Sequence, residues 1–143
     1  MEVICHGDFA PYNVVYQSQE IMGIIDFDCA YPGPRAWDVA YPLYRWAPLT
    51  NPNNNDGLGN LEERLLRAKL FLDCYGLALQ DRISLVELII KRLETLVKFM
   101  FAKTKAGDQI QQQNIKNNHH LEYLADIKYI KANKSIIKQS LCY

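Results

Sequence analysis

Two polar motifs lie at the two ends of a short stretch that the sequence predicts to be a β-hairpin. Residues 6–13 read His-Gly-Asp-Phe-Ala-Pro-Tyr-Asn, and Asp26 follows thirteen positions after Asn13. The β-branched or apolar runs Val14–Tyr16 and Ile21–Ile25 are separated by four polar residues, which is typical of two antiparallel strands joined by a tight turn. The predicted hairpin therefore joins Asn13 to Asp26.

The polar residues of these motifs match what phosphoryl transfer requires. In the protein-kinase template the catalytic loop reads H-R-D-x-x-x-x-N, its Asp receives the acceptor's proton, and its Asn and a later Asp hold magnesium. This chain keeps the spacing from His6 through Asp8 to Asn13, with Gly7 in place of Arg. Amide and carboxylate oxygens are ligands that magnesium prefers. Asp8 is therefore the candidate base, and Asn13 and Asp26 are the candidate metal ligands.

The distribution of charge supports a cation site near the motifs. The whole chain carries 16 basic and 16 acidic side chains, but residues 1–38 hold six acids against Arg35 alone, a net charge of −5. An acidic cluster suits divalent cations, and Asp28 is a candidate for a further ligand or for a carboxylate in a pocket wall. The overall neutrality provides no field that would favour nucleic acid, so we expect no such partner.

Length and composition are those of one globular domain. The chain has 143 residues, of which 49% are hydrophobic and 22% charged. It contains no apolar run near the roughly 20 residues of a membrane span, and its start lacks the features of a signal peptide, so we expect a cytoplasmic protein without a membrane partner. The four cysteines have no C-x-x-C spacing, which argues against a zinc site.

The remaining sequence predicts helices. Residues 31–34 break the structure, and a helix opens at Arg35, with Pro42 limiting its regularity. Residues 48–60 form a loop rich in Asn, Pro and Gly, and a helix follows over residues 61–75, with Asn60 as its N-cap and Gly76 as its stop.

Three further helices are predicted towards the end of the chain. Asp81 is expected to cap a long helix that ends near Gly107, a third helix runs through residues 121–130, and Asn133 caps a short last one. The predicted fold class is therefore α+β and mostly helical, with a small catalytic β-hairpin followed by a helical bundle. We expect a single domain, 1–143.

We divide this domain into three parts. Residues 1–47 contain the catalytic loop, the metal-binding hairpin and the first helix; residues 48–60 form the loop; and residues 61–143 form a helical subdomain on the acceptor side.

The motifs His6–Asn13, Ile25–Asp28 and Trp37–Ala40 resemble the carboxy-terminal lobe of the aminoglycoside phosphotransferase and choline kinase superfamily, which has a protein-kinase-like fold. The resemblance extends over the whole chain. It implies a small-molecule kinase that uses Mg²⁺ and moves the γ-phosphate of ATP or GTP to a hydroxyl of an aminoglycoside, of choline or a related aminoalcohol, or of a sugar.

The resemblance also assigns roles to individual residues. It implies that Asp8 is the catalytic base and that Asn13 and Asp26 bind magnesium. By the same analogy Asp38 anchors the backbone of the catalytic loop, and His6 is a structural member of that loop. The helices after Asn60, including the start of helix 61–75, would build the acceptor pocket, where carboxylates favour a cationic acceptor.

The family has an amino-terminal lobe with a glycine-rich loop and a lysine that pairs with phosphate. Only five residues precede His6. We therefore expect that this chain lacks the nucleotide-binding lobe, that another segment or chain supplies it, and that the chain alone binds ATP–magnesium poorly and is inactive.

Two other hypotheses stay open. One is a metal-dependent phosphatase that uses Asp26-x-Asp28 after an apolar strand, and the other is a non-catalytic, kinase-like remnant that acts as a binding module. We do not expect His119 and His120 to share a metal, because adjacent helical residues point about 100° apart. Tyr41, Tyr44 and Trp46 fit either an acceptor site or the core.

Overall fold

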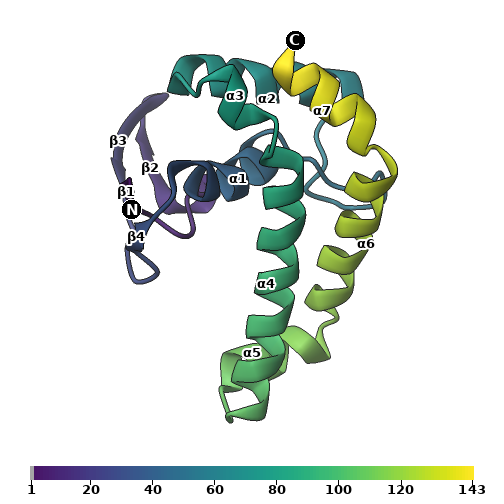
Figure 1. Cartoon of the computed structure of the whole chain (residues 1–143). Coiled ribbons are helices and arrows are strands. Elements are labelled where there is room, and N and C mark those ends of the chain that lie inside the picture. Colours follow the sequence, from purple (N-terminus) through teal and green to yellow (C-terminus); the bar gives the residue numbers. More distant parts are fainter. Residues whose placement is uncertain (1) are drawn as a thin grey trace.

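The computed structural model describes residues 2–143 and has an α+β architecture that is mostly helical (Figure 1). Its strands are β1 (Val3–Cys5), β2 (Val14–Gln17), β3 (Glu20–Ile24) and β4 (Tyr31–Gly33). Its helices are the short 3-10 turn η1 (Pro11–Asn13), α1 (Arg35–Trp46), α2 (Leu61–Tyr75), α3 (Leu79–Arg82), α4 (Leu85–Lys105), α5 (Gln109–Lys116), α6 (His119–Ala132) and α7 (Lys134–Cys142). The predicted combination of a small β part with many helices is confirmed.

The predicted hairpin is formed by β2 and β3. The two strands pair antiparallel, with Val14 opposite Ile24. Ser18 and Gln19 form the turn with positive φ angles of 50° and 69°, the backbone conformation that matches the twist of the two strands.

A second two-stranded sheet pairs β1 with β4, with Val3 opposite Gly33. The sequence predicted that residues 31–34 break the structure. This prediction is wrong, because Tyr31–Gly33 form the strand β4. Pro32 is tolerated because a strand in a two-stranded sheet has a free edge, where its missing N–H needs no partner. The pairing of β1 with β4 holds together the two ends of the segment 6–30. This segment contains the predicted catalytic loop and the hairpin.

Helix α1 continues through Pro42, although a proline removes one backbone hydrogen bond from a helix. The apolar face of α1 offsets this loss, since Val39, Leu43 and Tyr44 are each at most 1% exposed and belong to the main core. Helix α2 has the predicted bounds. Asn60 and Glu63 form a capping box at its start, and Gly76 ends it in a left-handed conformation.

The predicted cap at Asp81 is wrong. Asp81 lies inside the short helix α3, and α4 begins only after Ser84. Buried Arg82 explains the extra turn, because its side chain donates hydrogen bonds to the backbone oxygen of Leu77 and to the carboxylate of Asp73. These bonds hold α3 as a separate element.

The sequence also missed α5, which has few apolar residues and no buried ones. Its start is fixed by Asp108, whose carboxylate accepts a hydrogen bond from the backbone N–H of Gln111. Asn133 marks the junction of α6 and α7, but its side chain donates to the backbone oxygen of Tyr129 and does not cap α7.

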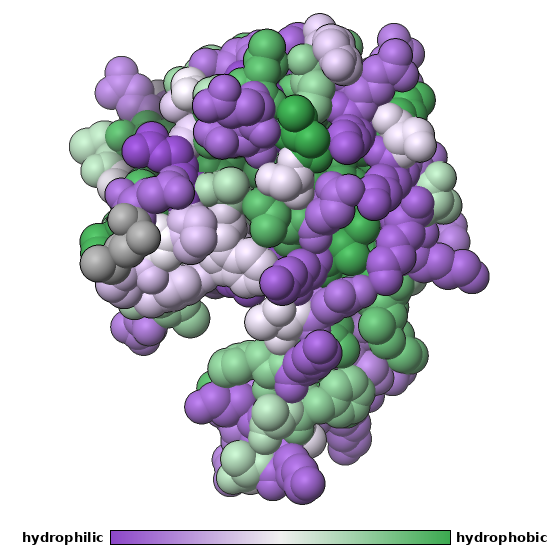
Figure 2. Space-filling model, viewed as in Figure 1, coloured by the Kyte–Doolittle hydropathy of each residue, from purple (hydrophilic) through white to green (hydrophobic). Residues whose placement is uncertain are grey.

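Helix α4 is the centre of the helical part and packs against α1, α5, α6 and α7 (Figure 1). It extends away from the β-strands to α5, and α6 returns beside it. The face in Figure 2 mixes hydrophilic and hydrophobic residues and is hollowed between the β-strand side and the far end of α4 and α5. Within residues 2–143, no helix is long and apolar enough to cross a membrane.

Candidate active site

The predicted catalytic loop, residues 6–13, requires a glycine at its second position. Gly7 has a φ of +84°, and a Cβ built there would lie 2.5 Å from the backbone oxygen of Cys29. A side chain at residue 7 would therefore push the loop away from the segment that follows the hairpin. The positive φ and this contact both favour glycine over a residue with a side chain at position 7.

His6 connects three parts of the site. Its backbone N–H donates to Asp38 Oδ1 at 2.9 Å, which ties the loop to the first turn of α1. Its Nε2 lies 3.0 Å from the backbone oxygen of Ile25, and its Nδ1 accepts from the backbone N–H of Asp8 at 3.2 Å. Because one ring nitrogen accepts and the other faces a carbonyl, the ring is the neutral tautomer protonated at Nε2.

The Asp8 carboxylate is held on both of its oxygens. Tyr12 donates its hydroxyl to Oδ1 at 2.8 Å, and Asn13 donates its Nδ2 to Oδ2 at 3.1 Å and to the backbone oxygen of Asp8 at 2.8 Å. Asn13 is 5% exposed. Its amide nitrogen is thus engaged, and its carbonyl Oδ1 is left as the acceptor that could bind a metal.

The hairpin pairs Asn13 with Ile25, the residue directly before Asp26. The backbone N–H of Ile25 donates to the backbone oxygen of Asn13 at 3.0 Å, one step beyond the last strand pair. Asp26 follows with a φ of 64°, a left-handed conformation that Asp tolerates better than most residues. Asp26 and Asp28 are both exposed.

These donors fit a magnesium ion. The set consists of an amide carbonyl and a carboxylate, which are hard oxygen ligands, and the exposure of Asp26 leaves room for water and phosphate oxygens. Within residues 2–143, no three His, Cys, Asp or Glu side chains converge on a common metal position. The proposed site has one acid, Asp26, and one amide, Asn13, so it is not a cluster of that kind. The absence of such a cluster therefore does not argue against it.

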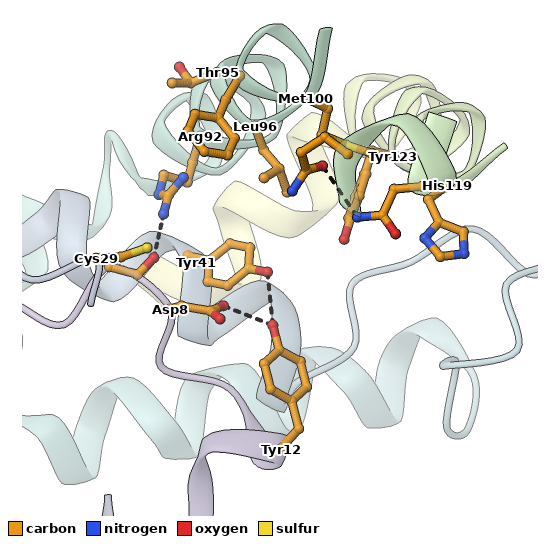
Figure 3. Close-up of a pocket in the computed structure, with 14 residues that line it drawn as sticks. Asp8, Tyr12, Cys29, Tyr41, Arg92, Thr95, Leu96, Met100, His119 and Tyr123 are labelled. Atoms are coloured by element: carbon orange, nitrogen blue, oxygen red, sulfur yellow. Dashed lines mark hydrogen bonds between the residues drawn. The ribbon is translucent and has the colours of Figure 1, made fainter. Parts of the chain in front are cut away.

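Asp8 lines a pocket of about 430 Å³ (Figure 3), a volume within the usual range for small-molecule sites. The predicted catalytic loop and α1 form one wall through Asp8, Tyr12 and Tyr41. Helices α4, α5 and α6 form the opposite wall, which contains apolar Leu96, Phe99 and Met100 and polar Gln111, Asn114, His119 and Tyr123.

Arg92 is the one arginine among the described residues that line this pocket, and it joins α4 to the predicted catalytic loop. Its Nη2 donates to the backbone oxygen of Gly7 (Figure 3), and its guanidinium lies 4.9 Å from the ring centre of Tyr41 and 5.7 Å from that of Trp37. Among the described lining residues Asp8 is the one carboxylate, so Arg92 balances its charge. The pocket is therefore close to neutral.

A second arginine lies behind the pocket wall, inside a ring of tyrosines. The Cζ of Arg45 is 5.3–5.7 Å from the ring centres of Tyr12, Tyr41, Tyr44 and Tyr123, within the range of cation–π attraction. Burial raises the pKa values of the Tyr12, Tyr44 and Tyr123 hydroxyls above the ordinary range. These hydroxyls therefore stay protonated at neutral pH and can donate hydrogen bonds.

Of the residues predicted to form the acceptor site, some line this pocket and others do not. Tyr41 lines the pocket, whereas Tyr44 is buried in the core, and neither Asp28 nor any residue of α2 is among the lining residues. Helix 61–75, expected to help build the acceptor pocket, does not line this one. The wall comes from α4, α5 and α6, because α2 packs against α1 and α7 instead.

Several pocket residues were missed from the sequence. Tyr12 lies inside the motif, directly before Asn13, and that position was the available signal. No sequence motif contains Arg92, Arg45 or Tyr123. They reach the site through contacts across 78 to 85 residues of sequence, which helical periodicity alone does not specify.

Comparisons with known proteins find similarity in the part of the chain that contains the motifs. Residues 1–71 match the model of the Phosphotransferase enzyme family. Over 64 residues the chain is 36% identical to an uncharacterized protein of Deinococcus radiodurans, covering 45% of this chain and 18% of that protein. Over 90 residues it is 32% identical to the trifolitoxin immunity protein of Rhizobium leguminosarum bv. trifolii. This match covers 62% of this chain and 34% of that protein.

The chain thus spans at most about a third of the length of these curated relatives. No solved structure matches it.

Proposed function

We propose that this chain, whose residues 1–71 match the model of the Phosphotransferase enzyme family, is the catalytic and acceptor-binding part of an ATP- or GTP-dependent kinase of small-molecule alcohols. Asp8 would accept the proton of the attacking hydroxyl. Asn13 and Asp26 would hold a magnesium ion, whose charge offsets that of the donor's phosphates. Asp28 is a further candidate ligand.

The supporting observation is the arrangement around Asp8. Its carboxylate faces a pocket of small-molecule size, and the hairpin joins the two proposed metal ligands beside it. An alcohol in the pocket would have its hydroxyl close to the base, which is the positioning that a loose phosphoryl-transfer transition state needs.

The nucleotide would lie on the hairpin side, against a lobe supplied by another segment or chain. Apolar side chains that are 43–63% exposed cover this side: Tyr16, Ile21, Met22, Ile24, Ile25 and Phe27. Burial of such a group of side chains against a partner is favourable. We place this assembly in the cytoplasm, where nucleoside triphosphates are the phosphate donors.

A test of the metal site needs no turnover. Mn²⁺ titrated into the ¹⁵N-labelled chain should broaden the amide signals around Asn13 and Asp26 first. Asp26→Ala should remove this selective broadening, and the exposed Asp81→Ala, remote from the motif, should retain it. Broadening that is unchanged in Asp26→Ala would contradict the assignment.

A test of the reaction uses the full-length natural protein. Transfer of radiolabelled γ-phosphate from ATP to a panel of choline, aminoglycosides and neutral sugars should be detectable, and Asp8→Asn should lower it by about 10²-fold or more. The matched Asp81→Asn variant should stay active. Equal activity in both variants would refute the role of Asp8.

The second candidate is a non-catalytic binding module, favoured by the same apolar hairpin surface. It predicts that full-length protein transfers no phosphate to any compound of the panel and that Mn²⁺ causes no selective broadening. The same family match makes the phosphatase hypothesis less well supported than the kinase.

A further inference from the structure

Hydroxyl groups connect Asp8 to Arg45 along one wall of the pocket, and the part next to Asp8 is visible in Figure 3. The Tyr12 hydroxyl donates to Asp8 Oδ1 at 2.8 Å and lies 3.3 Å from the Tyr41 hydroxyl. Arg45 Nε donates to the Tyr41 hydroxyl at 2.9 Å. The line therefore begins at a cation and ends at the proposed base.

The two ends fix the direction of the hydrogen bonds. A guanidinium only donates and an ionised carboxylate only accepts. Tyr41, which accepts from Arg45, consequently donates to Tyr12, and Tyr12 donates to Asp8. Each hydroxyl is thus used once as an acceptor and once as a donor.

We propose that Tyr12 and Tyr41 are positioning residues that hold the Asp8 carboxylate in one rotamer, with its outer face directed at the pocket. The functional meaning of this inference rests on the proposed role of Asp8 as the base. A restrained carboxylate needs less reorganisation when the acceptor hydroxyl arrives, and such preorganisation raises the rate of the chemical step.

The exposure of Tyr12 separates this role from ordinary packing. Its side chain is 58% exposed, so its ring contributes little to a core. Its hydroxyl nevertheless points inward to Asp8 and Tyr41. A tyrosine that served only as surface packing would have no need of the hydroxyl.

Several contacts hold the Arg45 end of the line. The four tyrosine rings surround its guanidinium, Nη2 donates to the Tyr123 hydroxyl at 2.7 Å, and Nη1 lies 3.6 Å from a carboxylate oxygen of Asp56. Tyr123 therefore contacts the same arginine as Tyr41 but is not part of the path to Asp8. This difference makes Tyr123 a matched control.

The experiment measures the χ1 rotamer of Asp8 by three-bond NMR couplings in the full chain, as wild type and as Tyr12→Phe, Tyr41→Phe and Tyr123→Phe. Each variant loses one hydroxyl and keeps its ring. Amide spectra and circular dichroism confirm that each variant is folded. The wild-type chain should show one Asp8 rotamer.

We expect rotamer averaging at Asp8 in Tyr12→Phe, weaker averaging in Tyr41→Phe, and the wild-type rotamer in Tyr123→Phe. A single rotamer in Tyr12→Phe would overturn the inference, and so would averaging in Tyr123→Phe equal to that in Tyr41→Phe. If a variant does not fold, a measurement on the wild-type chain still tests the bond between Tyr12 and Asp8. Its Tyr12 hydroxyl proton should exchange slowly with water, and rapid exchange would contradict the bond to Asp8.

Kinetics of the full-length protein separate this inference from the proposed function. Tyr12→Phe should lower kcat by about tenfold, the size of one hydrogen bond to a charged group, with an unchanged KM for the nucleotide. An unchanged kcat in an active protein refutes the positioning role alone. Absence of transfer in the wild type, together with Asp8 averaging in Tyr12→Phe, refutes the proposed function alone.

Discussion

Replacement of Asp126 by alanine should destabilise the protein strongly, although this residue lies outside the proposed site. Asp126 is 0% exposed and accepts four hydrogen bonds. Oδ2 accepts from the Tyr44 hydroxyl at 2.7 Å and from Asn54 Nδ2 at 3.0 Å, and Oδ1 accepts from the backbone N–H and Nδ2 of Asn51 at 2.7 and 2.6 Å. These bonds tie the loop 48–60 to α6.

The size of the loss depends on which donors can find water. The side-chain amides of Asn51 and Asn54 are on a surface loop and can turn outward. The Tyr44 hydroxyl belongs to a side chain that is 1% exposed, and the Asn51 backbone N–H cannot rotate independently. With about 1–3 kcal/mol for each of these two stranded donors, Asp126→Ala should cost about 2–6 kcal/mol, a large part of a typical stability of about 5–15 kcal/mol.

Urea unfolding followed by circular dichroism at 222 nm measures this cost. The control Asp81→Ala removes an exposed aspartate from α3 and should change stability by less than about 0.5 kcal/mol. The double variant Asp126→Ala/Tyr44→Phe also removes the stranded hydroxyl. It should be more stable than the sum of the single effects predicts, by about 1 kcal/mol or more.

An Asp126→Ala variant as stable as the control would refute the reasoning. Strict additivity in the double variant would show that the Tyr44 hydroxyl is not the group that is left unsatisfied.

Three further substitutions test the contacts around the site and on the helices. Gly7→Ala should abolish phosphate transfer by full-length protein while circular dichroism shows retained helices, because the added methyl meets a backbone carbonyl oxygen at 2.5 Å. Asp38→Ala leaves the backbone N–H of His6 without its acceptor and should lower stability by about 1–3 kcal/mol in urea titrations, whereas an unchanged midpoint would contradict the anchoring role. The hydrogen bond from Lys134 lowers the pKa of the Glu87 carboxyl, so its stabilisation is complete above the ordinary glutamate pKa and is lost as the pH falls below it. Glu87→Gln should therefore be less stable than wild type by at most about 1 kcal/mol at pH 6, and melting curves at falling pH should show the difference disappear.

The sequence predicted those elements whose signals are local. The β2–β3 hairpin follows from two apolar runs and a polar turn, and the bounds of α2 follow from Asn60, Glu63 and Gly76, which act on neighbouring backbone groups. The start of α4 was wrong because the side chain of Arg82 decides it, through bonds to residues in other elements.

The pocket wall was not predictable in the same way. Helical periodicity in α4 indicates which residues face inward but not which segment they meet. The contact of Arg92 with the Gly7 carbonyl spans 85 residues of sequence, and that of Arg45 with Tyr123 spans 78. Such contacts are set by the packing of whole helices, and a single sequence contains no local signal for them.

The same division separates the chemistry of the site from its selectivity. Side-chain hydrogen bonds of Asp8, Asn13 and His6 have both partners within the first 38 residues. These residues lie inside the segment that matches the phosphotransferase family. The opposite wall of the pocket comes from α4, α5 and α6, which lie beyond residue 71 and outside that match. Under the proposed function, substitutions at pocket-lining residues of α4 to α6 other than Arg92, which bonds to the backbone of Gly7, would change which alcohol is accepted and leave the base and metal ligands in place. Under the same proposal we expect an acceptor with few charges, because Asp8 is the one carboxylate among the described lining residues and Arg92 balances its charge.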